Sequence, residues 1–256
     1  MAYILLTRRF SRPLSRRLSA VIILHNKLTY ITKEELEIPR SAAEVRPWVD
    51  AILEEISKTE EGRQAVRFRE GYLKELTEET LPLGIFCEHY FNSSHCVTLN
   101  HLTGNQNYDV KITDKRLKQS PLKYLEITQA HEGEDAHLRM IKLKEEGHAN
   151  AFGKVKKIGT KHTGLSIEIE NEAIEHGELV RKELKRIHEA ANRKKGKVYP
   201  EGTGLIIICD DYVAFRKPED IVQLNEYIKN NVLPGLDNFT SIFVIGWSSK
   251  IFLEFD

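Results

Sequence analysis

The most constraining feature of the sequence is a change of hydrophobic periodicity near residue 97. Upstream, between residues 45 and 56, apolar residues recur at helical spacing. From Val97 to Gln129 they alternate with polar residues in short segments, which predicts closely spaced strands. An amphipathic helix over about 172–195 and an apolar run at 204–209 follow, and the run predicts a buried strand. This order predicts an α/β fold with a mixed central sheet flanked by helices.

The segment before the strands is predicted to be helical. Ser41 to Glu44 forms a capping-box pattern, and the apolar residues that follow predict a helix to Ile56. A second helix is predicted from Arg63 to about residue 80, extending past Pro82 with a kink. We therefore expect an N-terminal region that is mainly helical.

The helical and strand patterns predict two parts of the chain. Residues 1–62 form the N-terminal region, with short apolar segments near its start, and residues 63–256 form the α/β domain. Within this domain, a basic insertion is predicted at about 135–172, consisting of a helix followed by a hairpin.

The composition is that of a globular protein, with 41% hydrophobic and 30% charged residues and a formal net charge of zero over 256 residues. The three cysteines have no C-x-x-C spacing, which favours a reducing compartment over a disulfide framework. No apolar run reaches the length of a membrane span. We expect a cytoplasmic protein, although the Arg- and Ser-rich start resembles a transit peptide in composition.

Two carboxylates lie in the second and third predicted strands. Asp109 belongs to the strand expected at 108–112, and Glu126 stands in the middle of the segment YLEITQ. Strand alternation places Lys111 on the face of Asp109, and Thr128 on the face of Glu126. If the two strands are neighbours, the carboxylates meet and repel unless a cation lies between them, which predicts a Mg²⁺ or Mn²⁺ site. The alternative is two ordinary solvated carboxylates.

The order of elements, with Asp109 and Glu126, resembles the PD-(D/E)XK nuclease superfamily, which has a restriction-endonuclease-like core. The resemblance covers roughly residues 63–210. It implies a Mg²⁺-dependent endonuclease that cleaves DNA with these two carboxylates as metal ligands. Tyr108 stands where the motif has proline, and Thr128 stands where it has lysine. A threonine hydroxyl supplies no positive charge, but it can orient a water or a phosphate.

The resemblance leaves two members of the site open. A lysine displaced from position 128 would stabilise charge, and its candidates are Lys111, Lys194 and Lys197. The family often adds a glutamate from its first helix. The candidates for that glutamate are Glu75, Glu78, Glu79 and Glu88.

Basic segments near these strands predict contacts with DNA phosphates. Their members are Lys154, Lys156, Lys157, Lys161, Arg193, Lys195 and Lys197. The alternative is an exposed hairpin and a solvated helix face that bind nothing.

Three classes of function remain open at this point. The leading hypothesis is a metal-dependent nuclease-like protein that acts on or binds DNA, with a homodimer left open as its assembly. A non-catalytic member of the same fold could instead serve as a nucleic-acid-binding or protein-interaction module, which the missing lysine favours. The third class is a structural or regulatory protein without a nucleic-acid role, which the zero net charge favours.

Overall fold

A seven-stranded mixed sheet forms the centre of the molecule, in a computed structural model that describes residues 23–24, 27–28, 30–160 and 164–256. Most of the apolar and Arg-rich segments predicted near the start lie outside these residues. In spatial order, the strands are β11 (Phe252–Phe255), β10 (Ser241–Gly246), β9 (Thr203–Cys209), β6 (Tyr124–Gln129), β5 (Val110–Asp114), β4 (Val97–His101) and β3 (Arg40–Ser41).

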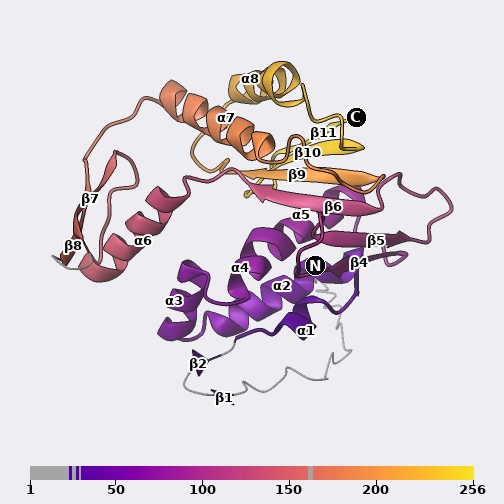
Figure 1. The fold of residues 1–256 in the computed structure, drawn as a ribbon, viewed down its shortest axis with the longest axis horizontal. Helices are drawn as coiled ribbons and strands as arrows, with labels where there is room; N and C mark the ends of the chain where they lie inside the picture. Colours follow the sequence, from indigo (N-terminus) through magenta and orange to yellow (C-terminus); the bar gives the residue numbers. More distant parts are fainter. Residues whose placement is uncertain (1–22, 25–26, 29, 161–163) are drawn as a thin grey trace, which may run out of the picture.

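The helices cover both faces of this sheet, as Figure 1 shows. They are α1 (Lys33–Leu36), α2 (Ala42–Ile56), α3 (Glu60–Phe68), α4 (Leu73–Glu75), α5 (Leu81–Tyr90), α6 (Glu134–Glu146), α7 (His176–Asn192) and α8 (Pro218–Tyr227), with π-helical segments η1 (Leu76–Thr80) and η2 (Ile228–Val232). The remaining strands form two small ribbons, β1 (Ile23–Leu24) with β2 (Lys27–Leu28), and β7 (Val155–Thr160) with β8 (Gly164–Ile169). The predicted fold class, an α/β mixed sheet with flanking helices and a helical N-terminal region, is confirmed.

The connections determine the direction of each strand. Successive strands from β3 to β6 pair antiparallel. β9 pairs parallel with β6 on one side and with β10 on the other. The parallel pairs need crossover connections, and these contain α7 and α8. β11 then returns antiparallel to β10 at the edge.

The apolar run of β9 is buried on both faces of the sheet. Leu205 and Ile207 pack with Leu184 of α7, and Leu224 of α8 lies in the same cluster. Ile206 and its alternate neighbours face the opposite cluster, which contains residues of α2 and α5. A strand covered by helices on both sides has no solvated face, which explains why its sequence does not alternate.

The predicted helix over 63–80 is wrong at its centre. α3 ends at Phe68, and a separate helix begins at Leu73. Between them, Arg69 and Gly71 take left-handed φ angles of 54° and 57°, a conformation that ends a helix. The helix does continue past Pro82 as predicted, because α4, η1 and α5 follow without a break.

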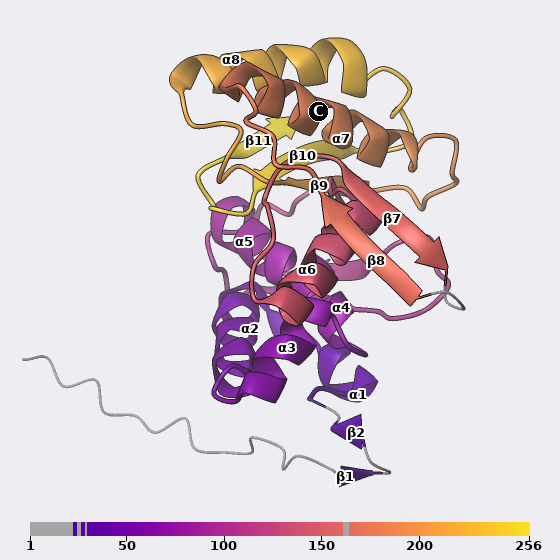
Figure 2. The ribbon, with the colours of Figure 1, turned by 90° about the vertical axis from the view of Figure 1, so that its left-hand side faces the viewer.

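The N-terminal region and the sheet share one core. β3 pairs with β4, and Ala42 and Val45 of α2 lie in the same apolar cluster as Phe86 of α5. The boundary at residue 62 stays a prediction. The insertion has the predicted elements, α6 and the β7–β8 hairpin, which project beside the core in Figures 1 and 2.

Candidate metal centre where two strands separate

The candidate site lies where β5 and β6 part. Their register pairs Lys111 with Tyr124 and Val110 with Leu125, and it ends there among the described residues. On its other side, β6 stays paired with β9 as far as Gln129. The last part of β6 therefore has one edge outside the sheet's hydrogen-bond ladder, and polar side chains gather along that edge.

Asp109 occupies the point of separation. It lies directly before β5 and not inside the strand, so the expected bounds of 108–112 are shifted by two residues. Its amide donates to the carbonyl of Leu125 at 2.8 Å. Its Oδ2 accepts a hydrogen bond from the amide of Ile127 at 2.6 Å, a bond that a neighbouring strand would otherwise make. The carboxylate thus stands beside Glu126, the residue between these two partners.

Glu126 is buried, with 7% of its surface exposed, on the sheet face that α7 covers. Its Oε1 accepts a hydrogen bond from Nζ of Lys194 at 2.5 Å. Lys194 follows the end of α7, and it is 68 positions away in the sequence. Of the candidate lysines, the structure therefore brings Lys194 to the carboxylates, whereas Lys111 is exposed on β5.

Burial and nearby negative charge make Asp109 hard to ionise. Desolvation is the largest cause, followed by the charges of Glu126 and Glu79, and together they raise the pKa of Asp109 to about 8. The Ile127 amide and the Lys194 charge act in the opposite direction. A carboxyl group in such surroundings ionises more readily when a cation binds beside it.

Tyr199 is a member of this site that the sequence did not reveal. Burial and the charges of Glu126 and Asp109 raise the pKa of Tyr199, so it stays a neutral phenol. Its ring packs on Phe239 at 4.5 Å between centroids. Its buried hydroxyl has no hydrogen-bond partner among the described residues. No motif marks this position, because only the packing of the 193–202 connection brings it near.

The four candidate glutamates lie on the helical segments α4, η1 and α5, and they differ in their partners and exposure. Glu79 accepts a hydrogen bond from Nε2 of buried His101 at 2.7 Å, and its charge reaches Asp109. Glu78 is paired with Arg69. The other two differ in exposure: one carboxylate oxygen of Glu75 is buried without a partner among the described residues, and Glu88 is exposed.

A cavity of about 200 Å³ adjoins the free edge of β6. It is lined by Glu78 and Glu79, by residues 127–129, and by His131 and Arg193. Thr128 is buried there, with 7% of its surface exposed. The predicted water- or phosphate-orienting residue and one predicted DNA-contacting cation therefore line the same space.

Gln129 holds the two walls of this cavity together. Its Nε2 donates to the carbonyl of Glu78 at 2.5 Å, and its own carbonyl accepts from Nη2 of Arg193 at 2.9 Å. Glu78 belongs to the π-helical segment η1, where the helical hydrogen-bond ladder is irregular, and Gln129 bonds its carbonyl from the sheet.

We expect the substitution Gln129→Leu to lower the free energy of unfolding by about 1–3 kcal/mol, because it removes the hydrogen bond to the Glu78 carbonyl. Urea denaturation of the two proteins measures this difference. A loss well below about 1 kcal/mol would contradict a structural role for this bond.

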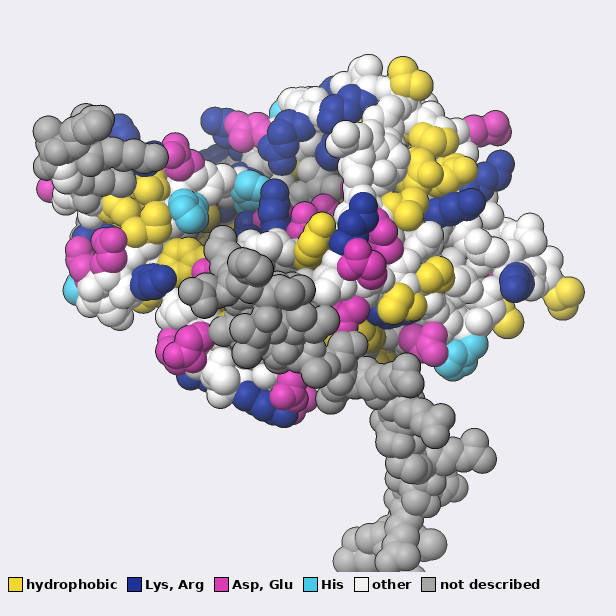
Figure 3. Space-filling view, turned by 60° about the horizontal axis from the view of Figure 1, so that its bottom comes forward, with side chains coloured by type: hydrophobic (Ala, Val, Ile, Leu, Met, Phe, Trp, Pro, Cys, Tyr) yellow, Lys and Arg dark blue, Asp and Glu magenta, His cyan; other side chains and the backbone are white. Residues whose placement is uncertain are grey.

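The remaining predicted cations are dispersed. Lys156 pairs with Glu170 at 2.5 Å, and Lys157 pairs with Glu134. Lys161 lies outside the described residues. The other predicted cations, Lys154, Lys195 and Lys197, have no ion pair among those described for the chain. Figure 3 shows Lys and Arg interspersed with Asp and Glu on the face that it presents, and not a surface of one sign.

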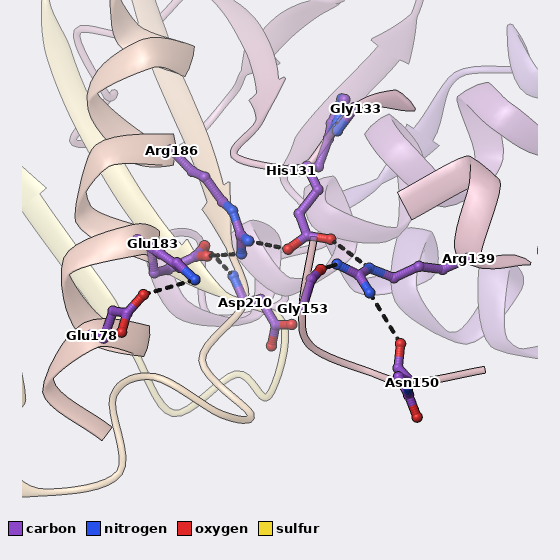
Figure 4. Close-up of polar contacts among 11 residues, drawn as sticks. His131, Gly133, Arg139, Asn150, Gly153, Glu178, Glu183, Arg186 and Asp210 are labelled. Carbon is purple, nitrogen blue, oxygen red and sulfur yellow. Dashed lines mark hydrogen bonds and ion pairs between the residues drawn. The ribbon is translucent and has the colours of Figure 1, made fainter. Parts of the chain in front are cut away.

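A second polar network joins the insertion to the core (Figure 4). Arg186 of α7 pairs with Glu183 at 2.9 Å and also with Glu132, and Glu132 accepts from Arg139 of α6 at 3.2 Å. Glu183 also accepts from the amide of Asp210 at 2.9 Å. Burial raises the pKa of Glu183 to about 7. All these groups have protein partners, so the network serves as an attachment.

The described residues contain no group of three or more His, Cys, Asp or Glu side chains placed to hold a metal ion. Among the helices in the described part of the chain, none is both long and apolar enough to span a membrane. Comparisons of the chain with protein-family models, with curated proteins and with solved structures found no match.

Proposed function

We propose that this chain is a metal-dependent, nuclease-like protein that acts on DNA. Asp109 and Glu126 would hold Mg²⁺ or Mn²⁺. The observation that carries the proposal is the 2.5 Å contact between Lys194 Nζ and Glu126 Oε1 beside buried Asp109. This contact places Lys194, from the end of α7, beside the carboxylates, whereas the family motif would have its lysine at position 128. The order α5, β4, β5, β6, α7, β9 also resembles the PD-(D/E)XK superfamily.

The donor set suits a hard divalent cation. Mg²⁺ is commonly held by one or two carboxylates, with waters and substrate phosphate oxygens completing its shell. A third protein ligand is therefore not required. Burial raises the pKa of Asp109 most and the charge of Glu126 raises it further, so the two carboxylates repel each other and a cation would relieve that repulsion. Glu79, oriented by His101, is the glutamate best placed to add to the site.

Each protein group has a role that its position supports. A bound ion would activate water and offset charge on the scissile phosphate. Lys194 would add positive charge at the same place, as a point charge with three donors. The Thr128 hydroxyl would orient a water or a phosphate oxygen from within the cavity. Tyr199 would present a neutral hydroxyl donor near the carboxylates.

The second candidate is a non-catalytic member of the same fold that binds nucleic acid or protein. One observation favours it: the charge of Glu126 is already offset by Lys194, so the buried pair is complete without a metal ion. Metal dependence separates the two candidates.

The test compares melting temperatures with EDTA, Mg²⁺ and Mn²⁺. A metal at about 100 times its Kd should stabilise the folded protein by about 2.7 kcal/mol. The substitution Asp109→Asn should abolish this gain and raise the metal-free melting temperature, because it removes a buried carboxylate beside Glu126. Since a metal ligand must be ionised, the gain in the wild type should increase as the pH rises through about 8.

The matched control is Asp237→Asn, which changes an exposed carboxylate. It should respond to metal like the wild type. An equal metal response in the Asp109→Asn variant would refute the proposed centre.

A further inference from the structure

The cavity at the end of β6 has a preformed shape. Its two walls, η1 and the end of α7, are joined through Gln129, whose side chain bonds one wall and whose carbonyl bonds the other. Parallel pairing with β9 turns alternate β6 amides away from β9, so the Gln129 amide is directed like that of Ile127, toward the free edge. The volume of about 200 Å³ is enough for a small polar group.

Arg193 supplies positive charge to this cavity. It occupies the C-cap position of α7, and its guanidinium makes one hydrogen bond to the described residues, from Nη2 to the Gln129 carbonyl. A guanidinium has five N–H donors in a planar fork that matches the oxygens of a phosphate. Most of its donors therefore remain for a ligand, and the Gln129 bond fixes the orientation of the group.

His131 supplies a second donor with a defined tautomer. Its Nδ1 accepts a hydrogen bond from the amide of Gly133 at 2.7 Å, so the ring proton lies on Nε2. Partial burial, together with the nearby charges of Arg69 and Arg193, lowers the pKa of His131, so the imidazole is a neutral donor at pH 7.

The two carboxylates of the cavity have donors of their own. Glu78 is paired with Arg69, and Glu79 accepts a hydrogen bond from His101. Arg193 is thus the cation available to an incoming ligand. Arg193, the Nε2 proton of His131 and the Thr128 hydroxyl are donors that suit an anion with several acceptor oxygens.

We propose that this cavity binds a phosphate group of the nucleic-acid strand, adjacent to the phosphate that lies at Asp109 and Glu126. The inference rests on the proposed function. Thr128 follows Glu126 by two residues, which corresponds to about 6.7 Å along a strand. That distance is of the order of the spacing between successive phosphates in a nucleic acid. Arg193 and His131 would then hold the strand in register with the metal centre.

The experiment measures binding of a fluorescein-labelled thymidine oligonucleotide to the full chain in EDTA, at several salt concentrations. The substitution Arg193→Gln should weaken binding about tenfold or more, because it removes a charged hydrogen-bond donor. The slope of log K against log salt should become shallower by about 0.7, the value for one phosphate on a single strand. The control Lys185→Gln, at an exposed lysine of α7, should change the affinity about twofold at most.

His131 provides a test that a general loss of positive charge would not affect. The substitution His131→Phe should weaken binding several-fold with an unchanged salt slope, because the lost donor is neutral. His131→Gln should keep wild-type affinity, since its amide can donate. The cavity assignment is overturned if Arg193→Gln weakens binding no more than Lys185→Gln does, or if His131→Phe binds as the wild type does. Undetectable wild-type binding at low salt would overturn it as well.

These experiments test the proposed metal centre and the proposed phosphate cavity independently. Binding in EDTA does not involve the metal. A full Arg193 effect without any metal response would refute the nuclease function and leave the phosphate cavity. A metal response without an Arg193 effect would support the metal centre and refute the phosphate cavity.

Discussion

The substitution Glu126→Gln is expected to lower Mn²⁺-dependent cleavage of DNA by at least about 100-fold, the upper range for groups that only support a metal ligand. The glutamine amide keeps nearly the same shape, and its oxygen can still accept from Lys194. The substitution does remove the negative charge that would hold the metal ion. The measurement compares cleavage of plasmid and single-stranded DNA by the wild type and the variant, prepared side by side.

Substitutions of the lysines show which one serves this site. Lys194→Met should lower cleavage, whereas Lys111→Met should leave it unchanged, because Lys111 is exposed and pairs in register with Tyr124. Thr128→Lys alone should crowd the site with a second cation. In the Lys194→Met background, the same change should restore part of the cleavage. Cleavage that survives Glu126→Gln undiminished would instead reveal a contaminant or a different site.

The second large effect concerns stability. Lys194→Met should lower the free energy of unfolding by about 3–5 kcal/mol, because it leaves the buried carboxylate of Glu126 without a charge partner. Urea denaturation at neutral pH in EDTA gives the value.

The double substitution Lys194→Met with Glu126→Gln is the control for this effect. It removes both charges, so it should cost much less than Lys194→Met alone. A matched lysine, Lys185, forms a 3.6 Å pair with Glu189 on the exposed side of α7, and its substitution by Met should cost about 0.5 kcal/mol or less. If the single and double variants were equally destabilised, the Lys194–Glu126 pair would not be the cause.

Local sequence patterns were enough to predict most of the elements. The capping box at Ser41 and Glu44 marks the start of α2, and it forms in the structure. The stripe that includes Val180, Leu184 and Ile187 of α7 is buried against the sheet. These features depend on residues close in the chain, where helical and strand periodicities are decided by side-chain burial. The same reasoning missed the break at Arg69 and Gly71, because it gave Gly71 no weight as a helix end, although glycine is the residue that most often takes the left-handed conformation there.

The sequence by itself determined the type and order of most strands and helices, and it marked Asp109 and Glu126 as a pair. Only the tertiary structure decided their partners. Lys194 reaches Glu126 from 68 positions away, Glu79 is singled out by His101, and Tyr199 comes from an irregular connection. Each of these contacts depends on how elements far apart in the chain pack across the sheet. Periodicity describes one element at a time, so it carries no information on such distances.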